Sequence, residues 1–150
     1  MALLQMIANP CDTDLALYNL CNYITDFEKT RGFIGGRGLR PAFAYEDMKE
    51  GQELWNKAFG RRAHHIVLCF SDAECITADE AKEIGMEVAS WFFPGWPVLF
   101  GVHTQQAHLH IHFAISNVNL ETGRKLHLDF GDMCSLQVRV YKLMQQSYLT

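Results

Sequence analysis

The sequence of 150 residues predicts an α+β fold with a largely antiparallel sheet flanked by helices. Apolar runs of strand length alternate with amphipathic segments of helical spacing. Two of the strand segments are separated by only a short polar stretch, which favours a hairpin. No repeat or linker divides the chain, so residues 1–150 are expected to form a single domain. A hydrophobic fraction of 49% with 20% charged residues is typical of globular proteins.

The first predicted elements are a strand over residues 3–8 and a helix that runs to about Asp26. Asn9-Pro10 ends the strand, and Asp12 or Thr13 can cap the helix with a side-chain oxygen. Apolar residues recur along this helix at helical spacing, so one stripe of it is expected to face the core. The stripe comprises Leu17, Leu20, Cys21 and Ile24.

Residues 30–59 are predicted to form a loop followed by a second helix. Residues 30–40 contain four glycines and lack apolar periodicity, which indicates an irregular segment. Pro41 is suited to the first turn of a helix, and a loose apolar periodicity extends that helix to about Phe59. The apolar residues concerned are Phe43, Met48, Leu54 and Phe59.

The remaining segments are predicted to form three strands and two helices. The continuous apolar run 66–70 has the length of a buried strand. Thr77-Ala78-Asp79-Glu80 is a capping-box pattern, in which the threonine and the glutamate each bond the other's backbone N–H, and it opens a helix to about Phe93. The hairpin strands and the last helix cover about residues 98–103, 109–118 and 132–147.

Charge and cysteine content exclude several classes of protein. A formal net charge of −4 argues against a nonspecific nucleic-acid coat protein, which would be basic. Residues 28–40 nevertheless carry four basic residues against one acidic, which suits a polyanion as well as plain solvated surface. Five cysteines without CxxC spacing favour reduced thiols in a cytoplasm. No apolar run is long enough for a membrane span, so no membrane insertion is expected.

Four of the seven histidines lie between residues 103 and 112. His108, His110 and His112 alternate with apolar residues, and alternate side chains of a strand share one face. One histidine on a strand is usually structural. Three in register, with His103 on the adjoining strand, are hard to explain by packing and indicate a site.

Strand geometry selects three of these histidines as metal ligands. Residues two apart on a strand lie about 6.6 Å apart, a comfortable separation for two imidazoles on one ion, as at His110 and His112. His103 can supply the third ligand if the hairpin pairs around residues 104–109. Neutral imidazoles leave coordination positions open for phosphate or water. His108 is a possible substitute ligand or phosphate contact.

Four segments in order resemble the relaxase (mobilization nuclease) family, the HUH endonucleases that nick plasmid or conjugative-element DNA at an origin of transfer. The segments are Asn22–Thr30 with its tyrosine, His65–Phe70, Ile76–Gly85, and His103–His127 with its metal motif. The resemblance, to MobA/MobL-like relaxase domains, implies the palm-like fold of these enzymes. Longer relaxases continue past this length, so the chain is expected to lack their C-terminal regions.

The resemblance also implies a mechanism and partners. Tyr23 would attack a phosphodiester of single-stranded origin-of-transfer DNA and form a 5′-phosphotyrosine, while His103, His110 and His112 would hold Mg²⁺ or Mn²⁺. Tyr18 lies about 140° round the helix from Tyr23, so the two cannot face one site. The implied partners are relaxosome accessory proteins and the conjugation coupling protein, in a bacterial cytoplasm.

Further residues are assigned lesser roles, and the motifs depart from the family pattern in places. Possible supporting residues are His65, His108, Gln105 and Asn119. Possible contacts to the DNA backbone are Lys29, Arg31, Arg37 and Arg40. Gln105 stands where the family commonly carries an acidic residue, and Cys69 replaces a serine.

Two other functions fit parts of the sequence. The alternation of histidines over residues 108–114 also matches the histidine-triad (HIT) hydrolases, in which the middle histidine attacks a nucleotide phosphate without a metal. Alternatively, the chain is a relaxase remnant that binds DNA or a relaxosome partner without cutting. The acidic balance, Gln105 and Cys69 allow this second alternative.

Overall fold

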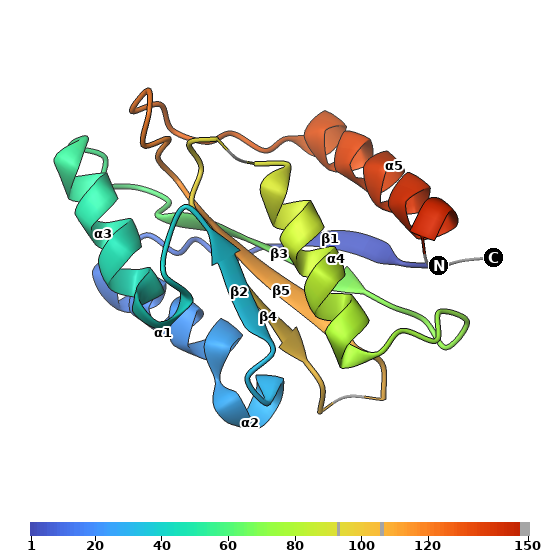
Figure 1. Cartoon of the computed structure of the whole chain (residues 1–150). Coiled ribbons are helices and arrows are strands. Elements are labelled where there is room, and N and C mark those ends of the chain that lie inside the picture. Colours follow the sequence, from blue (N-terminus) through green and yellow to red (C-terminus); the bar gives the residue numbers. More distant parts are fainter. Residues whose placement is uncertain (93, 106, 148–150) are drawn as a thin grey trace.

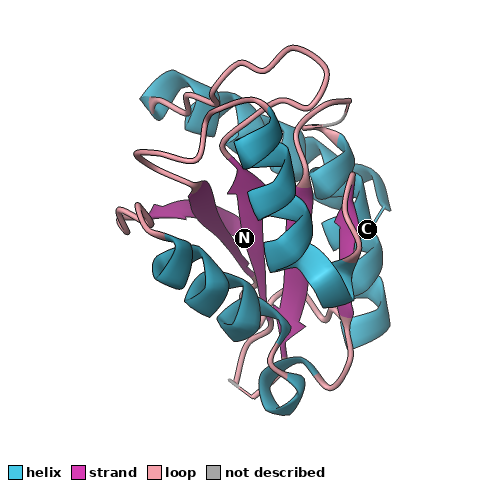
Figure 2. Ribbon diagram, turned by 90° about the vertical axis from the view of Figure 1, so that its left-hand side faces the viewer, coloured by secondary structure: helices cyan, strands magenta, loops and turns pink. Residues whose placement is uncertain are grey.

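The computed structural model describes residues 1–92, 94–105 and 107–147. Five strands form one antiparallel sheet in the order β1-β3-β5-β4-β2, with helices on both sides (Figure 1, Figure 2). The strands are β1 (Leu3–Ile7), β2 (Ile34–Arg37), β3 (Ala63–Cys69), β4 (Val98–His103) and β5 (His110–Ser116). The helices are α1 (Asp14–Thr25), α2 (Phe27–Thr30), the 3₁₀ turn η1 (Pro41–Phe43), α3 (Ala44–Leu54), α4 (Ala78–Ser90) and α5 (Phe130–Ser147). The predicted α+β class and largely antiparallel sheet are therefore confirmed.

The alternation of side chains along the strands divides the sheet into two different faces. One face packs under α4 and α5 and contains the largest buried side chains, including Phe100 and Phe113. On the other face, α1 and α3 form a second apolar cluster that takes Ala63, Leu99 and Ala114 from the sheet. The histidines of the sheet, except for His64, lie on this second face. They follow Ala63 along β3, follow Leu99 along β4 and precede Ala114 along β5.

Local signals in the sequence predicted the helix starts well. Thr13 caps α1 by accepting a hydrogen bond from the backbone N–H of Ala16 at 3.0 Å. The capping box of α4 is complete, because Thr77 and Glu80 each accept from the backbone of the other. The predicted stripe of α1 is fully buried. Its helix ends one residue early, at Thr25, because Asp26 caps the short helix α2.

The prediction of an irregular segment over residues 30–40 was wrong in its middle. β2 lies there and pairs with β4 at the edge of the sheet. An edge strand needs a partner on one side only, so it forms without apolar alternation. Gly35 permits the pairing, because a Cβ at this position would meet the ring of Phe100.

The helix predicted over residues 41–59 was also too long. η1 precedes α3, which ends at Leu54, and Asn56 has a left-handed backbone (φ 54°) that no helix continues through. Of the four apolar residues that suggested the helix, only Met48 is buried; the exposed ones are Phe43, Leu54 and Phe59.

Several other strands and helices begin or end a few residues from the predicted positions. β3 begins at Ala63, three residues before the predicted strand, and α5 begins at Phe130. α4 ends at Ser90, and the predicted end at Phe93 lies outside the described residues. Among the described residues, none of the helices combines the length and the apolar composition that a bilayer span requires.

Candidate active site

Strand pairing gathers four histidines on one face of the sheet. β5 lies between β3 and β4, and its His110 is directly opposite His103, while His112 is opposite Gly101 on one side and Val67 on the other. His65 of β3 lies two residues from Val67 and therefore shares their face. The pairing of the predicted hairpin is thus as expected, and His65 joins the group from a third strand.

The histidine rings and the ring of Tyr23 lie close together. The rings of His103 and His112 stack with centroids 4.0 Å apart, and those of His110 and His112 are 6.4 Å apart. The ring of Tyr23 lies 5.1 Å from that of His103 and 5.3 Å from that of His112. The residues predicted as nucleophile and ligands are therefore brought together. Tyr18 instead contacts Tyr45, as its place on the helix requires.

His65 contacts both Tyr23 and His112. Its ring lies 6.2 Å from that of Tyr23, and its Nε2 is 2.9 Å from Nδ1 of His112, a hydrogen bond between two imidazoles. His65 is buried, with 8% of its surface exposed. Sequence patterns indicate His65 only as a possible supporting residue, because pairing between distant strands is not visible in a local motif.

Gly101 allows the end of α1 to approach the sheet and so positions Tyr23. A Cβ at residue 101 would overlap the carbonyl oxygen of Ile24. That carbonyl accepts a hydrogen bond from Nε2 of His103 at 3.2 Å. Because a carbonyl only accepts, neutral His103 carries its proton on Nε2 and keeps the lone pair of Nδ1 free.

Replacing Gly101 by alanine is expected to destabilise the fold, because helix and strand must separate to admit the methyl group. We expect Gly101→Ala to lower the free energy of unfolding by about 2–3 kcal/mol in urea titration. Gly131→Ala is the matched control, since Gly131 is exposed and a Cβ there meets only Asp129 Oδ1 at 3.3 Å. Equal stability of the two variants would show that the close approach is not required.

Three histidines of the site, His65, His103 and His112, are neutral near pH 7. Burial, with a smaller contribution from neighbouring imidazoles, lowers the pKa of His112 to about 3 and the pKa of His65 to about 4. Burial also lowers the pKa of His103, and Lys29 adds to this effect. No proton has to be displaced from these rings before their lone pairs bind a cation.

The same pKa shifts predict that the metal-free protein loses stability in acid. Unfolded histidines take up protons below about pH 6.5, whereas His65 and His112 stay neutral in the fold until about pH 4 and 3. The free energy of unfolding should therefore fall as the pH falls from about 6.5 to 4, by on the order of 6 kcal/mol for the two histidines together. Urea titrations of the chelator-treated protein across this range test it. An unchanged pH dependence in the double variant His65→Gln/His112→Gln would contradict it.

The donor set suits a divalent cation, although its atoms do not already surround one point. Among the described residues, no three His, Cys, Asp or Glu side chains form a ready metal-binding arrangement. The Nδ1 atom of His110 is nevertheless buried without a hydrogen-bond partner in the described part of the chain. A cation bound by these imidazoles would supply that missing partner, so the residues present fit the ion by their chemistry.

Two hollows meet at Tyr23. The larger, of about 500 Å³, is lined by Asn9, Asn19 and His65 among others. The smaller, of about 290 Å³, extends past His103 and His110. Both include Ile7, Tyr23 and His112 in their lining. Together they form an open groove, which we call the tyrosine groove, with the phenol ring at its middle.

The residues predicted as DNA contacts separate into near and distant ones. Lys29 lies at the site, with its Nζ 5.6 Å from the centroid of the Tyr23 ring. Arg31 is exposed at the end of α2. Arg37 pairs with Val98 at the opposite end of β4 from His103. Arg40 is held by Asp47 through an ion pair of 2.7 Å.

The other predicted supporting residues lie outside the group of rings. His108 precedes β5 and pairs with Asp72 at 3.0 Å, beside a different hollow. Gln105 is exposed in the turn after β4. Asn119 follows the far end of β5, where its side chain accepts from the backbone N–H groups of residues 121 and 122 and forms a turn. The structure does not bring these three side chains to Tyr23.

Comparison with known proteins extends over most of the chain. The family model described as "Relaxase: MobA/VirD2-like, nuclease domain" matches residues 23–149. Proteins named "Protein rlx" from Staphylococcus aureus are 39% and 32% identical over 83 residues, which is 55% of this chain and 26% of each relative. The matched region thus spans about a quarter of the curated relatives. From the extent of the family match, the chain belongs to the relaxase family with a MobA/VirD2-like nuclease domain.

Proposed function

We propose that this chain is a single nuclease domain that nicks single-stranded DNA and rejoins it, with Tyr23 as the nucleophile. The observation that supports the proposal most is the position of the Tyr23 ring, within 5.1–6.2 Å of three histidine rings in an open groove. Tyr23 is 42% exposed, so a substrate can reach it. The proposed substrate is one DNA strand of an origin of transfer.

The reaction exchanges one phosphodiester bond for another. The phenolic oxygen of Tyr23 bonds to phosphorus, and the bond from phosphorus to the 3′-oxygen breaks. The phenol gives up its proton and the leaving 3′-oxygen takes one up, so a 3′-hydroxyl and a 5′-phosphotyrosine result. Because the bond energy is retained in the phosphotyrosine, the reverse attack rejoins the strand without another energy source. The ammonium of Lys29, with its Nζ 5.6 Å from the ring centroid, places a positive charge near the phosphate under attack.

His103, His110 and His112 are the proposed ligands of a divalent cation. When bound, Mg²⁺ or Mn²⁺ would polarise the scissile phosphate and neutralise part of its charge. His103 and His112, whose pKa values are lowered by burial, are neutral near pH 7 and add no charge of their own, so phosphate and cation can occupy the groove together. We further propose relaxosome accessory proteins and a coupling protein as partners in the bacterial cytoplasm.

The histidine-triad alternative is disfavoured by the position of His108. That mechanism requires the alternating histidines to act from one strand, but β5 begins at His110 and His108 is paired with Asp72. Nucleotide hydrolysis that persists in chelator would restore this alternative.

The proposal is tested without knowledge of the origin sequence. The protein is mixed with a randomised library of single-stranded DNA and Mn²⁺, and adducts that survive detergent are isolated and sequenced. We expect adducts that share a short sequence at the attached 5′ end. Failure of any adduct to form, although the library binds, would favour the binding remnant over the enzyme.

His65 is expected to orient His112 through their hydrogen bond. Outer hydrogen-bond partners of metal ligands typically contribute 10–100-fold to metal affinity or activity, so we expect His65→Ala to weaken Mn²⁺ binding by about 10-fold or more. His65→Gln retains a polar group in reach and should recover part of the loss. Titration calorimetry with Mn²⁺ measures both variants. Equal affinities for wild type, alanine and glutamine variants would contradict the positioning role.

A further inference from the structure

A group of cations lies at the end of the sheet away from the histidine rings. Lys57 and Arg61 belong to the segment that joins α3 to β3, and Arg124 and Lys125 follow β5. The two segments are tied together, because Nζ of Lys125 donates to the carbonyl of Phe59 at 2.8 Å. We call Lys57, Arg61, Arg124 and Lys125 the cationic cluster.

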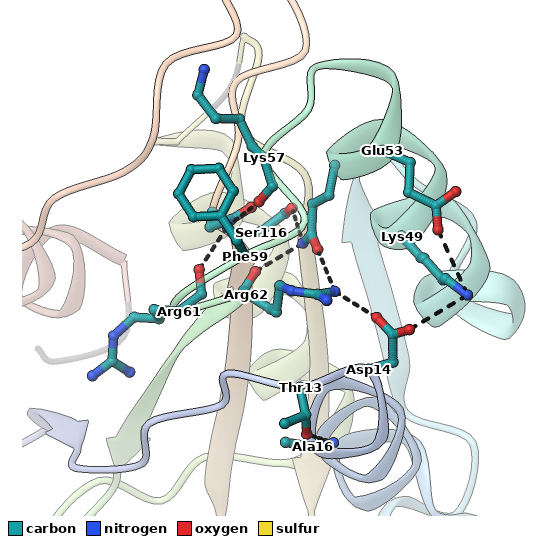
Figure 3. Close-up of polar contacts among 12 residues, drawn as sticks. Thr13, Asp14, Ala16, Lys49, Glu53, Lys57, Phe59, Arg61, Arg62 and Ser116 are labelled. Atoms are coloured by element: carbon teal, nitrogen blue, oxygen red, sulfur yellow. Dashed lines mark hydrogen bonds and ion pairs between the residues drawn. The ribbon is translucent and has the colours of Figure 1, made fainter.

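No carboxylate neutralises the cationic cluster in the part of the chain that the structure describes. The nearby Arg62 is buried and paired with Asp14 at 2.7 Å, but none of the four cluster members forms an ion pair among the described residues. The side chains of Lys57 and Arg61 point away from the buried contacts of Arg62 (Figure 3). Acidic residues outnumber basic ones in this chain, 17 to 13. A group of cations without ion-pair partners is therefore unexpected and indicates a site for an anionic ligand.

Lys125 is repelled by other positive charges, one of them in the cationic cluster and one beside it. The pKa of Lys125 is lowered by burial and, in addition, by the positive charges of Arg62 and Lys57. A bound anion would relieve this repulsion. The chain itself offers no such anion here among the described residues, so the relief would come from a partner.

Buried hydrogen bonds of Gln52 and Asn117 hold the backbone that carries Lys57 and Arg61. Gln52 is fully buried, and its Nε2 donates to the carbonyl of Arg62 at 2.9 Å and to the hydroxyl of Ser116 at 3.1 Å. Asn117 donates to the carbonyls of Lys57 and Arg61. The backbone that carries the cations is therefore held by β5, and ligand binding needs little ordering of the chain.

An exposed aromatic ring stands among the cations. Phe59 is 57% exposed, and Nζ of Lys125 lies 4.2 Å from its ring centroid. Exposed aromatic rings beside cations are the combination that binds single-stranded nucleic acid, because bases stack on the rings while phosphates meet the cations. An acidic protein surface would use the cations but not the free face of this ring.

The cationic cluster borders the tyrosine groove. The guanidinium of Arg61 donates to the carbonyl of Asn9, and Asn9 lines the larger hollow together with Tyr23 and His65. Residues 61 and 65 are four apart on an extended chain, a distance of about 13 Å. A strand that leaves Tyr23 along this hollow therefore reaches the cations after a short path.

We propose that the cationic cluster and Phe59 bind the phosphate backbone and a base of single-stranded DNA where the strand leaves the tyrosine groove. This inference rests on the proposed function, because it takes the strand at Tyr23 as its starting point. The contacts are to phosphate, so they hold the strand without selecting its sequence.

Equilibrium binding to a DNA that is not cut tests the inference. The probe is fluorescein-labelled oligothymidylate of about 30 nucleotides, longer than the footprint of a small binding domain, measured by anisotropy in chelator. We expect Lys57→Gln/Lys125→Gln to weaken binding about tenfold at low salt. The slope of log affinity against log salt should shrink by about 1.4, the value for two lost phosphate contacts on a single strand. The control Lys82→Gln/Lys142→Gln removes the same charge from exposed positions of α4 and α5 and should bind like wild type.

Two further measurements separate the possible outcomes. Lys57→Arg/Lys125→Arg keeps the charge and should bind oligothymidylate normally. The glutamine variant should keep the unfolding temperature of the wild type, which excludes misfolding as the cause of its weaker binding. Equal affinity of Lys57→Gln/Lys125→Gln and wild type, or equal losses in both glutamine pairs, would overturn the inference. Failure of the wild type to form a covalent adduct would refute the proposed reaction and leave the binding result in place.

Discussion

Tyr23→Phe is expected to abolish the covalent adduct with single-stranded DNA while the fold stays intact. Tyr23 is 42% exposed, and its hydroxyl forms no hydrogen bond with any residue that the structure describes. Loss of the hydroxyl should therefore not change the free energy of unfolding noticeably. Removing the nucleophile of a covalent mechanism typically reduces the rate by several orders of magnitude, so we expect a fall of at least about a thousandfold. Adduct formation from the sequence selected by the library measures it.

Tyr18→Phe is the matched control for this variant. Tyr18 belongs to the same helix and is 46% exposed, close to the value for Tyr23, but its ring contacts Tyr45 instead of the histidines. It should form the adduct at the rate of the wild type. An adduct that persists in Tyr23→Phe and disappears in Tyr18→Phe would place the nucleophile on the other side of α1.

Removal of the divalent cation is expected to have an effect of similar size. Chelator should abolish the adduct, and His112→Gln should weaken Mn²⁺ binding by at least about a hundredfold, more than an outer partner contributes. His112 lies at the centre of the group, with the rings of His65, His103, His110 and Tyr23 around it. Titration calorimetry and adduct formation at rising Mn²⁺ concentration measure the two losses.

His108→Gln is the control for the loss of a histidine in general. His108 lies just before β5, but its partner is Asp72. The variant should bind Mn²⁺ as wild type does. If it lost the metal while His112→Gln kept it, the ligand set would have to include His108, and the account of the site given by the strand register would be wrong.

Short-range patterns predicted the parts of the fold that neighbouring residues determine. The capping box at Thr77 and the alternation of His110 and His112 with buried Ile111 and Phe113 are both present as expected. Each depends on backbone geometry over a few residues, and so can be identified from spacing alone. The pairing of His103 with His110 followed from the short connection between their strands.

Features that depend on distant pairing were not predictable in the same way. β2 forms because β4 offers a free edge, and His65 joins the site because β3 pairs with β5. The helix beginning after Pro41 ends at Leu54 because residue 56 adopts a left-handed backbone, which apolar spacing did not indicate. Asn119 lies close to the histidines in sequence but beyond the far end of the same strand.

Mapping of the covalent adduct by mass spectrometry tests the central claim most directly. The adduct is digested with a protease and a nuclease, and the peptide that carries a nucleotide is identified. We predict a single modified peptide, with a 5′-phosphate ester on the phenolic oxygen of Tyr23 and a free 3′-hydroxyl on the released DNA. A nucleotide attached to a histidine, or cut DNA with a free 5′-phosphate and no attached peptide, would contradict the account.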